Sequence, residues 1–176
     1  RSPGMHDFKS DLKWSHEQSD QPWWEEVYRA AFPDFVAMHD VRQDGWAQRG
    51  GIDRQIVLED GTVLKVDEKV RKKAYPDILL EAFSDWDKGK PGWLDKGLTC
   101  DFIAYAFAET KTCYLLPFRT LRSAWVANRS EWWAKYGRCD AANRGYTTVS
   151  VPVPINVLMA AMQDAMVVNW ATKAAA

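Results

Sequence analysis

The sequence has few of the residues that build disulfide or zinc scaffolds. Its 176 residues hold only three cysteines, Cys100, Cys113 and Cys139, and three histidines. The cysteines are odd in number and far apart, with no CxxC spacing and no nearby histidine pair that would indicate zinc. We therefore expect buried free thiols, and we assign the histidines no role.

Long hydrophobic runs and an excess of charge are lacking too. No apolar run reaches the roughly 18 residues of a membrane span, and no signal-peptide hydrophobic region is found near the N-terminus. We expect a soluble, cytoplasmic protein in a reducing environment, with no membrane partner. With a net charge of -1 the protein as a whole is not basic, so a surface that binds anions must come from a local cluster of basic residues.

Tryptophan, in contrast, is abundant, with ten residues in the chain. Most of them fit an aromatic core, and some are expected in clefts or interfaces. The length suits one domain. Residues 1–20 are predicted to form an N-terminal arm, in which Arg1 to Gly4 resemble a cloning remnant, and residues 21–176 to form the single domain.

The hydrophobic pattern predicts an α/β fold, with a central mixed β-sheet flanked by helices. A helix is expected from Pro22 until Phe32-Pro33, because apolar residues recur there at helical spacing. Other predicted helices cover 121–136 and a closing segment from 155 to 166, and predicted strands cover 78–83, 102–107, 113–116 and 147–153.

The segment 85–97 is expected to be an exposed loop, because it is rich in Gly, Lys, Asp and Trp. Its residues Trp86, Lys88, Lys90 and Trp93 mix cations with aromatic rings. Such a mixture suits an element that binds a strand or inserts into a groove. A plain surface loop with tucked indoles explains it equally well.

The most informative stretch is Gly51-Ile52-Asp53, followed across an Asp60-Gly61 turn by Asp67-Glu68-Lys69. A two-residue loop would place Asp53 opposite Glu68, whereas a three-residue loop with a left-handed glycine places it opposite Asp67. The longer loop is favoured, because it gives one apolar face, with Arg54 near Glu68, and one polar face. The apolar face would hold Ile52, Ile56, Leu58, Leu64, Val66 and Val70.

In that register the polar face holds Asp53, Asp67 and Lys69 together. Residues directly opposite each other lie about 5 Å apart at Cβ, and two ionised aspartates at that spacing repel unless a cation joins them. Mg²⁺ or Mn²⁺ suits hard carboxylate oxygens beside a phosphate. The ammonium of Lys69 could orient an attacking water and stabilise charge on the phosphorus oxygens.

The G-I-D entry and the D-E-K tripeptide after a hairpin resemble the PD-(D/E)XK nuclease superfamily. The resemblance implies a restriction-endonuclease-like αβββαβ core; its motif-bearing part covers roughly residues 21 to 85, and the strand pattern through Phe107 is compatible with that core. It also implies a Mg²⁺- or Mn²⁺-dependent endo- or exodeoxyribonuclease of the kind found among restriction enzymes, Holliday-junction resolvases and phage-type exonucleases. Asp53 and Asp67 would be the metal ligands and Lys69 the catalytic lysine. DNA would be the partner, and many such nucleases act as homodimers.

Accessory residues are predicted around these three. Members of the superfamily often place a further acid on the first helix, where Glu26 is favoured over Glu25. Gln55 shares the strand face of Asp53, and Glu81 is a candidate acid beside the site. The basic run of Arg71, Lys72 and Lys73 could contact a DNA backbone, or be a solvated face.

Two other functions remain open from the sequence. One is a non-catalytic member of the same fold that binds nucleic acid or protein. The other is an unrelated α/β binding module in which the D-x-K tripeptide is accidental, since so short a motif recurs by chance in many proteins.

Overall fold

The computed structural model describes residues 20–173, and an amphipathic helix lies near the start of this part of the chain. The helix α2 (Trp23–Ala31) buries Trp23, Trp24, Val27 and Tyr28, which lie on one side of a 3.6-residue repeat. The amide of Phe32 closes its last turn by donating to the carbonyl of Tyr28, and Pro33 follows. The predicted first helix is therefore confirmed.

Six strands form a mixed sheet, which we call sheet A, in the order β1-β2-β3-β6-β7-β10. Its neighbours are antiparallel except β3 and β6, which run parallel. The strands are β1 (Phe35–Asp40), β2 (Arg54–Leu58), β3 (Val63–Arg71), β6 (Phe102–Phe107), β7 (Thr112–Pro117) and β10 (Met166–Asn169). The short helix α3 (Gly45–Gly50) lies between β1 and β2.

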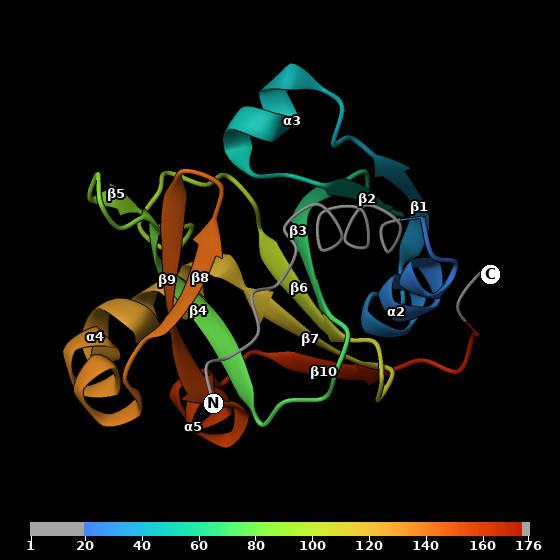
Figure 1. Ribbon diagram of the computed structural model, residues 1–176. Coiled ribbons are helices and arrows are strands. Elements are labelled where there is room, and N and C mark those ends of the chain that lie inside the picture. The colour runs from blue at the N-terminus through green and yellow to red at the C-terminus, as the bar shows by residue number, and fades with distance from the viewer. Residues whose placement is uncertain (1–19, 174–176) are drawn as a thin grey trace.

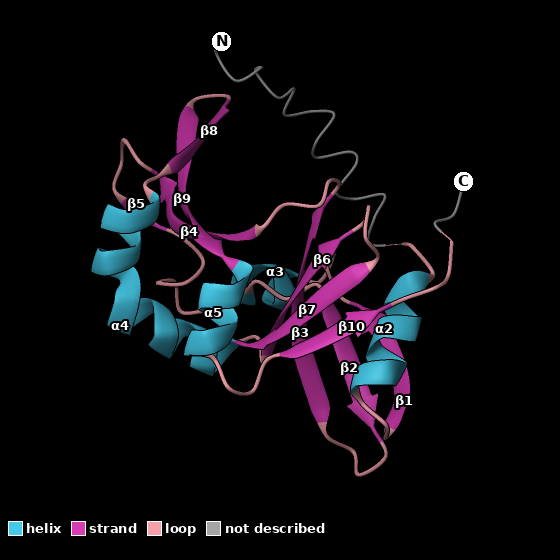
Figure 2. Cartoon of the chain, turned by 90° about the horizontal axis from the view of Figure 1, so that it is seen from below, coloured by secondary structure: helices cyan, strands magenta, loops and turns pink. Residues whose placement is uncertain are grey.

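Four further strands form an antiparallel sheet B, in the order β5-β4-β9-β8. They are β4 (Asp77–Asp85), β5 (Lys90–Pro91), β8 (Cys139–Asn143) and β9 (Tyr146–Pro154). The helices α4 (Phe118–Tyr136) and α5 (Ile155–Ala161) contact β9. Figures 1 and 2 show α2 beside sheet A and α4 beside sheet B, on opposite sides of the molecule.

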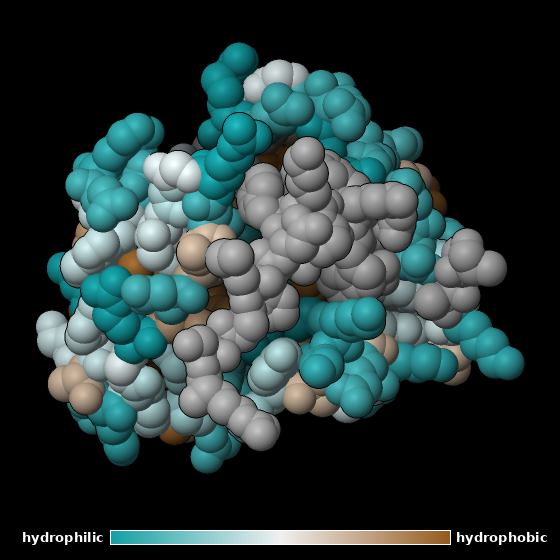
Figure 3. All heavy atoms as spheres, in the orientation of Figure 1, coloured by the Kyte–Doolittle hydropathy of each residue, from teal (hydrophilic) through white to brown (hydrophobic). Residues whose placement is uncertain are grey.

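The two faces of sheet A belong to two different apolar clusters. One face packs against α2 and buries Ile56, Val66 and Leu115 with the indoles of that helix. The other packs with sheet B and α4, joining Ile103, Tyr105 and Leu116 to Leu80, Trp125 and Val151. Hydrophilic residues dominate the surface around α3 and along the rim seen in Figure 3.

The expected α/β architecture is correct only in its single domain and its mixed sheet. Sheet B covers the second face of sheet A together with α4, so the molecule is an α+β domain. Between the parallel strands β3 and β6 the chain forms β4 and β5 instead of the helix that an αβββαβ core would carry. The apolar run 78–83 and the alternation of 147–153 predict a strand in each segment, but they do not show that the two strands pair with each other.

The closing helix is shorter than predicted. It ends at Ala161 with Met162 at its C-cap, and Met166 instead begins β10, which pairs with β7. The methionines are spaced as in a helix, but Val167 and Val168 are β-branched and suit the sheet edge. The strands β1, β5, β8 and β10 and the helix α3 were absent from the prediction.

The segment 85–97 is exposed over most of its length, as expected, but not throughout. Trp93 and Leu94 are buried in the cluster between the sheets, while Trp86 stays 39% exposed. Of the cysteines, Cys100 and Cys113 are buried free thiols as expected, but Cys139 is exposed. No helix within residues 20–173 is long and apolar enough to cross a membrane. The predicted arm, apart from Asp20, lies outside the described residues.

Candidate active site

The hairpin between β2 and β3 has the three-residue loop that the side-chain pattern favours. The amide of Leu58 donates to the carbonyl of Thr62 at 2.9 Å, and Gly61 has a left-handed φ of 84°. The Oδ1 of Asp60 accepts the Thr62 amide at 2.9 Å, an Asx-type contact that suits the turn. The pairing continues to Arg54 opposite Val66, which brings Asp53 beside Asp67 and confirms the predicted register.

Asp53 is held at the start of β2 by its backbone and by its side chain. Gly51 ends α3 with a φ of 68°, a conformation that suits glycine and turns the chain toward β2. The amide of Asp53 donates to the carbonyl of Val66 at 2.9 Å. Its Oδ2 accepts the amide of Glu68 at 2.7 Å. Beyond the last pair of β2 and β3, the carboxyl of Asp53 thus accepts the amide that a backbone carbonyl would otherwise accept.

The hairpin register places the carboxyls of Asp53 and Asp67 next to each other on one face of the sheet, where a hydrogen bond between them contributes to the pKa of Asp53. Asp67 is 8% exposed and lies on the face of β3 that is directed toward sheet B. Burial, the charge of Asp67 and this hydrogen bond raise the pKa of Asp53 to about 8. At neutral pH the pair therefore holds a proton, as expected of two carboxyls that cannot both ionise without a cation.

Lys69 completes the group on the same strand face. Its Nζ lies 3.2 Å from Oδ2 of Asp67 and 5.0 Å from the ring centre of the buried Trp93. Burial opposes its charge, but the carboxylates of Asp67, Glu81 and Asp53 outweigh that effect and raise its pKa. The ammonium is thus held protonated between acids from both sheets.

Glu81 reaches this group from β4 of sheet B. Burial raises its pKa, while the charges of Lys69 and Lys96 and the amide of Trp93 act in the opposite direction. The site therefore forms where the two sheets meet, with the acids of the hairpin on one side and Glu81 on the other. The prediction of Glu81 as a nearby acid agrees with this placement.

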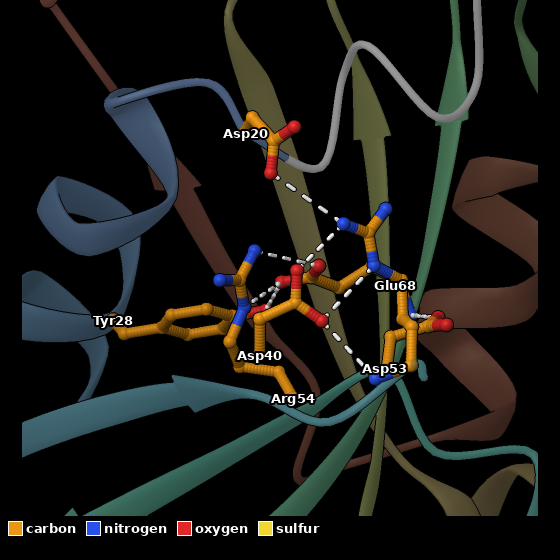
Figure 4. A network of polar contacts seen from close by, with 7 residues as sticks. Asp20, Tyr28, Asp40, Asp53, Arg54 and Glu68 are labelled. Atoms are coloured by element: carbon orange, nitrogen blue, oxygen red, sulfur yellow. Dashed lines mark hydrogen bonds and ion pairs between the residues drawn. The ribbon is translucent and has the colours of Figure 1, made fainter. Parts of the chain in front are cut away.

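A second ionic network lies on the opposite face of the same strands (Figure 4). Arg54 donates to both carboxylate oxygens of Glu68, at 3.2 and 3.0 Å, and the hydroxyl of Tyr28 donates to Glu68 as well. The side chains of Arg54 and Glu68 are only 7% and 4% exposed. Because Glu68 also donates its amide to Asp53, this network fixes the strand segment that carries the site.

Other predicted residues are placed elsewhere. Glu26 lies on α2, and its carboxylate accepts the amides of Ala171 and Thr172, which follow β10, at 2.8 and 3.0 Å. Its role there is to hold the segment after β10, so the prediction of a helix-borne acid at the site is wrong. The helical spacing of the sequence showed that Glu26 lies at the edge of the apolar stripe of α2, but not which part of the chain it faces.

The three residues of the basic run after Lys69 differ in their surroundings. Arg71 pairs with Asp77 at 2.9 Å and stacks over Tyr75 at 3.8 Å, so its guanidinium is committed to the protein. Lys72 and Lys73 are exposed. Gln55 is half-buried on β2, opposite Lys65 of β3 and His39 of β1, two residues beyond Asp53.

One neighbour of the acids was not predicted as a site residue. Burial, with the charge of Asp67 next, raises the pKa of the Cys100 thiol to about 12, so the thiol is protonated and unreactive. Cys100 precedes β6, and β6 pairs with β3 in parallel. Only that long-range pairing brings it to Asp67, and the local sequence carries no sign of it.

The carboxylates of Asp53 and Asp67 are of the kind that binds a hard divalent cation, but they are few in number. Two carboxylates in contact, whose mutual repulsion is relieved only by a shared proton, match the one or two protein carboxylates that Mg²⁺ commonly uses. Within residues 20–173, however, no group of three or more His, Cys, Asp or Glu side chains is arranged to hold a metal ion. Substrate oxygens and water would have to complete the coordination.

The coupling of Asp53 to Asp67 makes stability depend on pH. Since the folded pKa of Asp53 lies at about 8 and its ordinary value is 3.8, ionisation should progressively destabilise the metal-free fold between pH 4 and 8. Asp53→Asn keeps an acceptor for the Glu68 amide and adds a donor to Asp67. We expect its gain in unfolding free energy to grow from near zero at pH 4 to on the order of 3 kcal/mol above pH 8.

Urea denaturation with EDTA across this pH range measures the effect. The matched control is Asp87→Asn, at an exposed loop position. A gain for Asp53→Asn that does not change with pH would show that the two carboxyls do not share a proton.

The chain was compared with protein-family models, with curated proteins and with solved structures, and none of the three comparisons found a match. A function for the group formed by Asp53, Asp67, Lys69 and Glu81 must therefore be inferred from its own geometry.

Proposed function

We propose that this protein is a metal-dependent nuclease that hydrolyses DNA phosphodiester bonds. Asp53 and Asp67 would hold Mg²⁺ or Mn²⁺, and Lys69 would position water and stabilise the transition state. The observation that carries the proposal is the contact of the two aspartates across the hairpin, with the lysine ammonium 3.2 Å from one of them. This arrangement follows from the turn register and matches the resemblance to the PD-(D/E)XK superfamily.

Each residue has a separate task. The carboxylates of Asp53 and Asp67 face each other and can bind one cation from two strands, so that ionising both no longer costs stability. When bound, Mg²⁺ supplies Lewis-acid chemistry: it neutralises charge on the phosphate and makes water more acidic.

Lys69 carries a fixed positive charge next to this carboxylate pair. Its contact with Asp67 and the influence of Glu81 keep the ammonium protonated, while Trp93 limits its movement. An ammonium held in that way can donate a hydrogen bond to a phosphate oxygen on which negative charge increases during the reaction. Glu81 is assigned the role of positioning Lys69.

Cation binding can be tested without any substrate. We expect Mn²⁺ titrated into the purified protein, followed by isothermal calorimetry, to bind at one site at pH 8. Asp67→Ala should weaken this binding at least tenfold, because it leaves only one carboxylate, whereas Asp87→Ala should leave it unchanged. Binding that survives Asp67→Ala would place the cation elsewhere.

The reaction itself is tested by incubating the protein with Mg²⁺ or Mn²⁺ and linear, nicked, branched and single-stranded DNA. We expect at least one of these forms to be cleaved, and EDTA to stop the cleavage. If DNA binds but none of the forms is cut, the non-catalytic binding function becomes the better explanation of the site.

A further inference from the structure

A pocket of about 750 Å³ opens between the segment before β6 and the first turns of α4. Thr99, Cys100 and Asp101 lie along one side, and Arg119, Arg122 and Val126 along the other. Both arginines are exposed. They are three residues apart, so they project from the same side of the helix.

Among the described residues, Arg119 and Arg122 differ from most other arginines in that they form no ion pair with an acid. Arginines 29, 42, 54, 71, 129 and 138 each form an ion pair. Within residues 20–173, neither Arg119 nor Arg122 forms one. The first turn of α4 also has no acidic residue, so its helix dipole adds to the positive potential.

Asp101 is the acidic residue that lines the pocket, and its carboxylate is already engaged. Its Oδ2 accepts the amide of Lys65 at 2.8 Å, and its backbone carbonyl accepts the amide of Phe118 at the start of α4. Asp101 thus joins β3 to α4, while the guanidinium groups of the two arginines keep donors free for an anion from solvent.

The pocket shares a wall with the candidate active site. The amide of Thr99 donates to the carbonyl of Gly50 at 3.3 Å, and a Cβ on Gly51 would lie 2.7 Å from Leu98. This close packing places the segment 98–101 against the chain that leads into Asp53. On its other side the same segment continues into β6, the strand that pairs with Asp67.

We infer that this pocket binds the sugar-phosphate backbone of a DNA strand that extends from Asp53 and Asp67, with Arg119 and Arg122 contacting successive phosphates. The choice of ligand rests on the proposed function, since a phosphodiester at the two aspartates must continue along the surface. Guanidinium groups suit phosphate because they donate in pairs. The exposed Val126 beyond them offers an apolar contact for a sugar or a base.

The inference is tested by DNA binding in EDTA, where the proposed hydrolysis cannot occur. Fluorescence anisotropy of labelled single-stranded and duplex oligonucleotides compares wild type with Arg119→Ala/Arg122→Ala over a range of salt concentrations. We expect the double variant to bind about 10- to 30-fold more weakly at low salt. The slope of log affinity against log salt should fall by about 1.4 to 1.8, as for two lost phosphate contacts.

The matched control removes two exposed cations elsewhere, Lys135 near the other end of α4 and Arg144 in the turn between β8 and β9. Lys135→Ala/Arg144→Ala should change affinity less than threefold. Equal losses in both double variants would overturn the inference, because only general charge would then matter. No DNA binding by wild type at low salt would overturn it as well, as would displacement of DNA by inorganic phosphate at equal phosphate concentration.

Cleavage assays separate this inference from the proposed function. If the arginines govern DNA binding but wild type cuts no DNA with Mg²⁺ or Mn²⁺, the hydrolysis proposal fails and the strand-binding pocket stands. If wild type cuts DNA and Arg119→Ala/Arg122→Ala has an unchanged KM, hydrolysis stands and the pocket proposal fails. A raised KM with an unchanged kcat is the expected result.

Discussion

Replacing Asp67 with asparagine should lower metal-dependent DNA cleavage at least about a thousandfold. The change removes the charge that faces Asp53 and leaves only a neutral amide beside Lys69, whose Nζ lies 3.2 Å from Oδ2 of Asp67, so the cation and the ammonium both lose a charged partner. The fold should survive, because an amide fits the same space and the repulsion with Asp53 disappears. Initial rates with Mg²⁺ and with Mn²⁺ measure the loss.

The control for this result is Asp87→Asn, which should cleave like wild type. Lys69→Met separates the lysine from the acids, because it removes the ammonium and keeps most of the side-chain volume beside Trp93. We expect it to lower kcat about 100- to 1,000-fold while Mn²⁺ still binds. An Asp67→Asn protein that cleaves normally, or an active Lys69→Met protein, would contradict the roles assigned here.

The geometry around Asp53 and Asp67 could be predicted because it depends on local chemistry. Asp60 and Gly61 specify a bulged turn, the alternation of Ile56, Leu64 and Val66 selects a face, and a hairpin then fixes which residues lie opposite each other. All of this information is contained within about 20 residues. The strands β6 and β7 were also predicted closely, since their apolar runs are bounded by polar residues.

Features that depend on long-range pairing could not be predicted. The pairing of β4 with β9 joins residues about 70 positions apart, and the strand patterns do not show which strands are partners. For the same reason Glu81 could be named as a nearby acid but not placed beside Lys69. The burial of Trp93 and the approach of Cys100 to Asp67 likewise follow from the docking of sheet B.

Glu26 illustrates a different limit. Its place at the edge of the stripe of α2 suits a site acid, and the superfamily resemblance favours one there. Its true partners, Ala171 and Thr172, come from the far end of the chain and follow β10. Because the predicted closing helix ended at Met166 and β10 was not predicted, no backbone donors were expected near Glu26, and Glu26 was placed at the site instead.

The largest stability effect is expected at Arg54. Arg54→Met should destabilise the protein by about 3–5 kcal/mol, because it leaves the buried carboxylate of Glu68 with the Tyr28 hydroxyl and the charge of Arg42 but without its bidentate partner. Thermal and urea unfolding at pH 7 measure the loss. Arg29→Met, which breaks an exposed ion pair with Glu25, should cost less than about 1 kcal/mol and serves as the control.

A rescue experiment distinguishes buried charge from lost packing. Burial already raises the pKa of Glu68, against the opposing effect of Arg54, and removing Arg54 raises it further. The folded state then favours protonated Glu68, so the Arg54→Met protein should lose stability as pH rises above the ordinary value of 4.5. Arg54→Met/Glu68→Gln should recover most of the loss at pH 7, since Tyr28 can still donate to the amide oxygen. A double variant as unstable as Arg54→Met would show that arginine acts there through packing, and that the network behind the hairpin does not hold the site by charge.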